Sequence, residues 1–84
     1  MQLLEVKWVD AHNLSGGWND KDELDVFAKD EAYKVTSVGF LVHEDDLCIV
    51  LAGRVSPATD NYEAHYGLLE RLPKKIIDKR RIIK

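Results

Sequence analysis

The chain has 84 residues, of which 45% are hydrophobic and 32% are charged, and its net charge is -3. This length supports one domain with a single core, and the composition is typical of a globular protein rather than a disordered one. The longest uncharged apolar run, residues 47–53, is far shorter than the ~20 residues that a membrane span needs, and one cysteine excludes an internal disulfide.

The first predicted element is a strand over residues 3–11, because Leu4, Val6 and Trp8 alternate with polar residues at the period of a half-buried strand. We expect Trp8 to lie in the core. Residues 12–20 contain Ser, Gly and Asn in succession and predict a loop.

A short helix is predicted over residues 20–32, with Asn19 or Asp20 as its N-terminal cap. Acidic residues in the first turn favour this start. Leu24 and Phe27 are the side chains that we expect to turn inward.

Two β-prone segments, residues 33–43 and 46–55, predict a hairpin with Asp45 and Asp46 in its turn. This turn would place Val42 opposite Ile49 and Phe40 opposite Leu51. One face of the hairpin then holds five apolar core candidates: Val38, Phe40, Val42, Ile49 and Leu51. The other face is also apolar, so we expect the chain's own helical turn or a second subunit to cover it.

The C-terminal part begins with a predicted loop over residues 56–61, rich in turn-forming side chains. A fourth strand follows over residues 62–72, and Pro73 ends it because proline cannot donate a hydrogen bond to a neighbouring strand. Residues 73–78 suit one tight turn, and residues 79–84 a short fifth strand.

The predicted order of elements is the order found in SH3-like and Sm-like barrels: a strand, a long loop with a helical turn, a hairpin, a fourth strand, a tight turn and a short fifth strand. Curling the sheet also removes exposed edges. We therefore expect residues 1–84 to form one mainly β domain, a small five-stranded, strongly bent antiparallel sheet or an SH3-like or Sm-like barrel with one short helix. The alternative is an open α+β sheet with the helix packed across it.

Charge is distributed unevenly along the chain. Residues 70–84 hold seven basic and two acidic side chains, a net charge of +5, whereas the other 69 residues hold five basic and thirteen acidic ones, a net charge of -8. A bipolar protein of this kind can steer a charged partner, dock an anionic ligand at one end or pair with itself. A solvated surface without any partner is the alternative.

His43-Glu44-Asp45-Asp46 begins like the helix of a zinc protease, but Leu47 occupies the position of the required second histidine, and the flanking residues favour strands. An acidic turn between strands explains these residues better, and weak binding of a divalent cation by the acids is the alternative.

Cys48 lies between Leu47 and Ile49, with acids nearby that disfavour a thiolate, so we interpret it as a structural thiol even though the predicted register brings it close to His43. His12, His43 and His65 lack the spacing of a metal site. We therefore predict no catalytic residue, no bound metal and no cofactor.

Several segments together resemble a diffuse group of small proteins encoded in tailed-bacteriophage genomes. They are "WVDAH", the lone Trp18, "VTSVGFLVHED" with "IVLAG", and "LPKKII". Because these motifs are a strand, a hairpin and a proline turn, the resemblance carries over no catalytic or ligand-binding residue. It implies an accessory protein that acts in the bacterial host cytoplasm, and the sequence shows no secretory signal at its start.

Exposed aromatic and basic side chains are the candidates for a partner site. Trp18 follows two glycines and is either a lid over the barrel or an exposed anchor. The partner-binding residues that we predict are Trp18, Tyr62, Tyr66, Lys74, Lys75, Lys79, Arg80 and Arg81. The function predicted from them is that of a non-catalytic phage protein that binds and modulates a host bacterial protein. The alternative is an Sm-like homo-oligomer that binds a nucleotide or RNA through the basic C-terminal segment.

Overall fold

The computed structural model describes residues 1–11, 17–29 and 34–84. Its elements in chain order are β1 (Leu3–Val9), α1 (Lys21–Ala28), β2 (Lys34–Glu44), β3 (Cys48–Ser56), β4 (His65–Pro73), a 3₁₀ turn η1 (Lys74–Ile76) and β5 (Ile77–Ile82).

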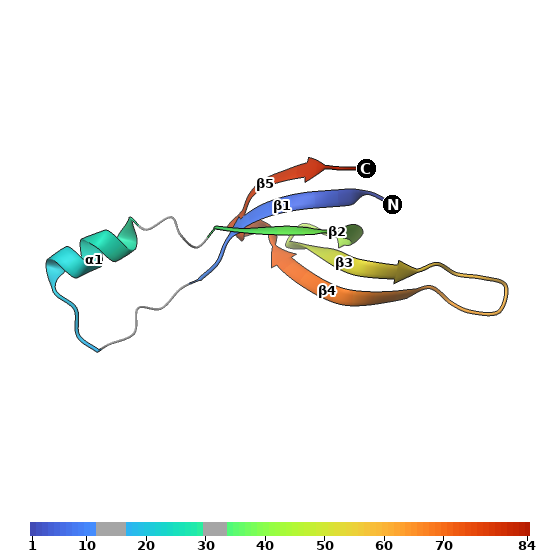
Figure 1. The fold of residues 1–84 in the computed structure, drawn as a ribbon, viewed down its shortest axis with the longest axis horizontal. Helices are drawn as coiled ribbons and strands as arrows, with labels where there is room; N and C mark the ends of the chain where they lie inside the picture. The colour runs from blue at the N-terminus through green and yellow to red at the C-terminus, as the bar shows by residue number, and fades with distance from the viewer. Residues whose placement is uncertain (12–16, 30–33) are drawn as a thin grey trace.

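The strands form one antiparallel sheet in the order β4-β3-β2-β1-β5 (Figure 1). The predicted mainly β fold with five antiparallel strands, a short helix and a tight turn before the last strand is therefore confirmed. The sheet is not closed into a barrel, because β4 and β5 remain its two edges.

β2 joins the two halves of the sheet, because its residues 34–40 pair with β1 and its residues 40–44 pair with β3. The core consists of side chains from strands that are not all neighbours in the sheet: Leu4, Val6, Ile49, Leu51 and Leu72. Because β1 contributes to the same cluster as β3 and β4, the sheet must bend at β2.

Gly39 lies where β2 passes from one pairing partner to the other. A Cβ atom at this position would lie 3.0 Å from the carbonyl oxygen of Ala52 and 3.0 Å from the Cβ of Leu51. The missing side chain thus lets β3 approach β2 closely at the bend.

Trp8 packs against the core cluster, as its alternation with polar residues predicted. Its indole Nε1–H donates a hydrogen bond of 2.9 Å to the hydroxyl oxygen of Ser37 on β2. The polar end of a partly buried tryptophan is therefore satisfied.

The β2–β3 hairpin has a different register from the predicted one. Leu41 lies opposite Leu51, and the register shifts between Leu41 and His43. Leu41 therefore packs against the core, while Val38, predicted as a core residue, is 55% exposed.

Asp45 explains why the predicted register is wrong. Its Oδ1 accepts hydrogen bonds from the backbone N–H groups of Leu47 at 2.8 Å and Cys48 at 2.9 Å. This arrangement is an Asx-type turn, in which the side chain replaces a backbone acceptor. Three residues, 45–47, thus separate the strands, so that β3 begins at Cys48.

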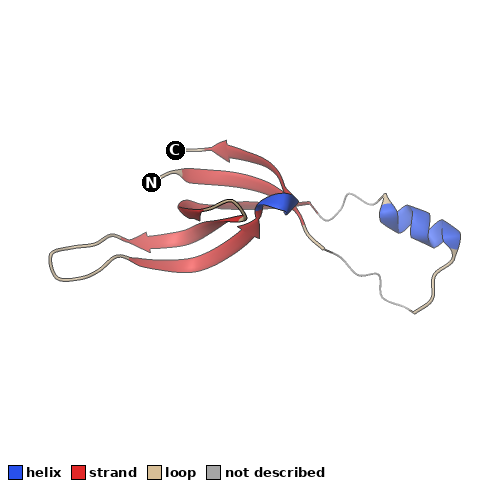
Figure 2. Ribbon diagram, turned by 180° about the vertical axis from the view of Figure 1, so that it is seen from behind, coloured by secondary structure: helices blue, strands red, loops and turns tan. Residues whose placement is uncertain are grey.

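α1 begins after Asp20, whose carboxylate accepts a 2.8 Å hydrogen bond from the backbone N–H of Glu23, and this predicted cap is confirmed. None of the helix residues is buried, and Figures 1 and 2 place the helix away from the sheet. The inward packing predicted for Leu24 is wrong, and Phe27 is only half-buried. Acidic residues at positions 22, 23 and 25 leave this short helix without a continuous apolar stripe.

Candidate functional site

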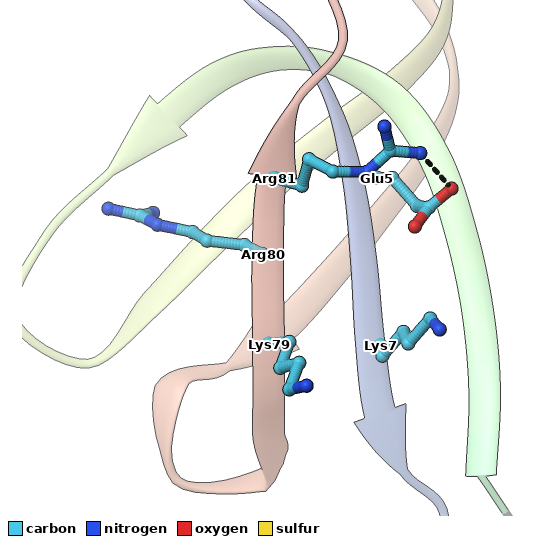
Figure 3. Close-up of a pocket in the computed structure, with 5 residues that line it drawn as sticks. All are labelled: Glu5, Lys7, Lys79, Arg80 and Arg81. Carbon is cyan, nitrogen blue, oxygen red and sulfur yellow. Dashed lines mark hydrogen bonds and ion pairs between the residues drawn. The ribbon is translucent and has the colours of Figure 1, made fainter.

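Basic side chains gather where β5 pairs with β1. The register places Glu5 opposite Arg81 and Lys7 opposite Lys79. Glu5 and Lys7 face away from the core because they alternate with the inward-facing residues of β1. An open hollow of about 270 Å³ lies here, and we call it the basic hollow (Figure 3); it is lined by Glu5, Lys7, Lys79, Arg80 and Arg81.

The pair formed by Lys7 and Lys79 is unusual, because like charges at directly opposite positions destabilise neighbouring strands. Both side chains are exposed, and within the described residues neither forms an ion pair. Figure 3 shows both lysines on the same side of the strands as Arg81, whereas Arg80 extends the opposite way. A bound anion would remove the repulsion between the two ammonium groups.

Glu5 fixes the position of Arg81 in the basic hollow. The distance from Arg81 Nη2 to Glu5 Oε2 is 2.9 Å. The hydrogen bond from Arg81 lowers the pKa of the Glu5 carboxyl below its ordinary value of 4.5, and burial opposes this shift only in part. Glu5 is therefore charged at neutral pH.

A second cluster adjoins the basic hollow at the end of β2. Glu44 Oε2 lies 3.0 Å from both Lys74 Nζ and Arg80 Nη1. Hydrogen bonds from Lys74 and then Arg80 lower the pKa of Glu44. η1 is held beside this cluster because the backbone N–H of Lys74 donates a 2.8 Å hydrogen bond to the carbonyl oxygen of Leu47.

The two clusters adjoin each other around the edge strand β5, where Arg80 points to the side opposite Lys79 and Arg81 (Figure 3). A hollow of about 330 Å³ beside Glu44 shares two lining residues, Lys79 and Arg80, with the basic hollow. We call the whole the basic surface; its charged residues are Glu5, Lys7, Glu44, Lys74, Asp78, Lys79, Arg80 and Arg81. Cations outnumber carboxylates here, so the surface attracts anions.

Four of the eight predicted partner-binding residues lie together on the basic surface: Lys74, Lys79, Arg80 and Arg81. Lys75 lies nearby, in a hollow that it shares with Val9 and Ile76.

The predicted aromatic residues lie elsewhere. Trp18 precedes α1 and is fully exposed, which excludes its alternative role as a lid. Tyr62 lies in the loop between β3 and β4, and Tyr66 lies on β4, at the edge of the sheet opposite β5. The aromatic and basic candidates therefore do not form a single site.

Sequence reasoning missed four members of the basic surface: Glu5, Lys7, Glu44 and Asp78. The outward position of Glu5 and Lys7 followed from the alternation in the first strand. The sequence did not show that Glu5 and Lys7 lie close to the basic C-terminal segment, because this proximity depends on the pairing of β1 with β5.

The predicted structural thiol fits its surroundings, because Cys48 is only 3% exposed at the start of β3. His65 lies on β4, where its Nδ1 is 2.8 Å from the carbonyl oxygen of Glu63, and His43 lies near the end of β2. His12 falls outside the described residues.

Among the described residues, no helix has both the length and the apolar character needed to cross a membrane. Comparisons with family models, with curated proteins and with solved structures gave no match to this chain. We therefore infer function from the geometry and chemistry of the basic surface.

Proposed function

We propose that this protein is a non-catalytic binding protein that holds an acidic segment of a partner protein on its basic surface. The observation that carries this proposal is the exposed pair Lys7 and Lys79, two cations at opposite positions beside Arg81. A carboxylate placed between them would form charge-assisted hydrogen bonds and remove their repulsion.

An acidic peptide suits this surface better than a long nucleic acid. Glu5 and Glu44 lie among the cations and would repel a continuous row of phosphates. The residues that line the two hollows also include no aromatic ring on which a base could stack. A short segment that carries separate carboxylates can avoid the two glutamates and still reach the lysines.

The resemblance to tailed-phage proteins supports a partner in the bacterial host cytoplasm. In this setting the protein acts as an accessory factor that binds a host protein and modulates it. A small domain that presents a charged surface suits the role of an inhibitor or adaptor.

Fluorescence anisotropy with a short labelled peptide of alternating Asp and Glu tests the proposal. We expect binding that weakens as salt is added, because screening reduces charge attraction. Lys79→Glu should weaken binding about tenfold, which corresponds to a loss of roughly 1.4 kcal/mol in binding free energy. Lys21→Glu, which makes the same charge change on α1, is the matched control and should leave binding nearly unchanged. Equal losses in the two variants would show that only net charge matters, contrary to the proposal.

A nucleotide- or RNA-binding oligomer is the second candidate. One feature of the sheet favours an oligomer. The open edge strand β4 exposes Leu68 and Leu69, which a second copy of the chain could cover. A single-stranded RNA of matched charge, titrated in the same assay, separates the candidates. Tighter binding of the RNA than of the acidic peptide, together with an oligomer in light scattering, would favour this candidate. Affinity purification from bacterial lysate with and without nuclease would then show whether the recovered partner is protein.

A further inference from the structure

The turn between β2 and β3 brings together three side chains whose donor atoms are typical metal ligands. His43 lies near the end of β2, Asp45 in the turn and Cys48 at the start of β3. One nitrogen, one oxygen and one sulfur atom from these residues all lie within 4.8 Å of one another. The register and the Asx-type turn create this cluster; the sequence indicated that Cys48 lies close to His43 but not that Asp45 lies between them.

The carboxylate of Asp45 is the common point of the cluster. Its Oδ1 is held by the backbone N–H groups of Leu47 and Cys48. Its Oδ2 lies 2.8 Å from Nε2 of His43 and 3.8 Å from Sγ of Cys48. One oxygen is thus fixed by the turn, and the other faces both remaining donors.

The size of the cluster suits a tetrahedral Zn²⁺ ion. Usual Zn–N, Zn–O and Zn–S bond lengths place neighbouring ligand atoms about 3.3 Å apart for N and O and about 3.5 Å apart when one of them is S. The observed 2.8 Å between Nε2 and Oδ2 must open slightly, and the observed 3.8 Å between Sγ and Oδ2 must close slightly. The nitrogen of His43 and the sulfur of Cys48, which lie within 4.8 Å of each other, must also approach to about 3.5 Å. The exposed His43 side chain can make these adjustments by rotation, since 54% of it is accessible to solvent.

The donor set selects a class of metal. A thiolate and an imidazole favour Zn²⁺ or Co²⁺ over hard cations such as Mg²⁺ and Ca²⁺, which prefer oxygen ligands. We propose that His43, Asp45 and Cys48 bind one Zn²⁺ ion through Nε2, Oδ2 and Sγ, with the fourth position open to water or to a donor from a partner. On binding, Cys48 releases its thiol proton to solvent and acts as the thiolate. This site uses none of the residues of the basic surface and does not depend on the proposed function.

Titration of the full chain with Co²⁺, under a phosphine reductant and after treatment with a chelator, tests the site. We expect a thiolate-to-cobalt charge-transfer band that saturates at one ion per chain, and Zn²⁺ should abolish it by displacement. Cys48→Ser should remove the band, and His43→Asn should weaken binding at least about tenfold. His65→Asn is the matched control, because His65 lies on β4 outside the cluster, and it should bind Co²⁺ as the unaltered chain does.

Absence of a charge-transfer band in the folded chain would overturn the proposal. An unchanged affinity in His43→Asn would also overturn it, since the thiol would then bind without the imidazole. Cys48 is buried, so its replacement risks unfolding, which circular dichroism would detect. His43→Asn alters an exposed side chain and decides the question if Cys48→Ser does not fold.

Discussion

Two glutamates, Glu5 in β1 and Glu44 at the end of β2, determine how the cations of β5 and η1 are arranged. Each accepts hydrogen bonds from basic side chains, and each has a lowered pKa for that reason. Lys7 and Lys79 have no such partner among the described residues. At the scale of single residues, the surface therefore consists of cations held in place and cations that remain available to a ligand.

Replacing Glu5 by Gln should lower the stability of the protein at pH 7. The folded-state pKa of Glu5 lies below its unfolded value, so its contribution is complete above about pH 4.5 and is lost as the pH falls through the folded pKa. Urea unfolding should show a larger difference between Glu5→Gln and the unaltered chain at pH 7 than at pH 3. The same difference at both pH values would assign the effect to packing rather than to the ion pair with Arg81.

At the scale of elements, the sequence predicted most strands and the tight turn, because alternation, β-branched residues and proline are local signals. The hairpin register could not be predicted. Both faces of residues 33–55 are apolar, so the pattern did not identify the core face. The carboxylate of Asp45 sets the length of the turn, because it accepts hydrogen bonds from two backbone N–H groups. The composition of the segment does not reveal this geometry.

Gly39→Ala tests the bend in β2. The added methyl would lie 3.0 Å from the backbone oxygen of Ala52, and a backbone atom cannot move aside easily. We expect a loss of about 1–3 kcal/mol in the free energy of unfolding, measured with urea.

Gly67→Ala is the matched control for the bend, because its nearest obstacle is the flexible side chain of Arg54. This variant should be as stable as the unaltered chain or up to about 1 kcal/mol more stable, since alanine restricts the unfolded chain. Similar losses at positions 39 and 67 would show that close packing at the bend has no special role.

At the scale of the whole molecule, β4 and β5 are the two edges of the sheet and are joined by η1, and the β3–β4 loop lies at the end of the sheet away from η1 (Figure 1). The basic segment at the C-terminus was visible in the sequence as an excess of charge. The contribution of β1 to the basic surface was not visible in the sequence. Glu5 and Arg81 are 76 positions apart in the chain and meet only because their strands pair. The predicted aromatic residues lie away from it for the same reason, since exposure and side-chain type do not determine where an element lies in the sheet.

The central claim, that the surface formed by β1, β5 and η1 binds an acidic segment, is tested most directly by NMR mapping. Amide chemical shifts of the full chain are recorded while the Asp/Glu peptide is added. We expect the largest changes at Lys7, Lys79 and Arg81 and in η1, with little change in α1 or the β3–β4 loop. Changes centred on Trp18 or Tyr62, or the absence of any change at concentrations that saturate the anisotropy signal, would contradict this account.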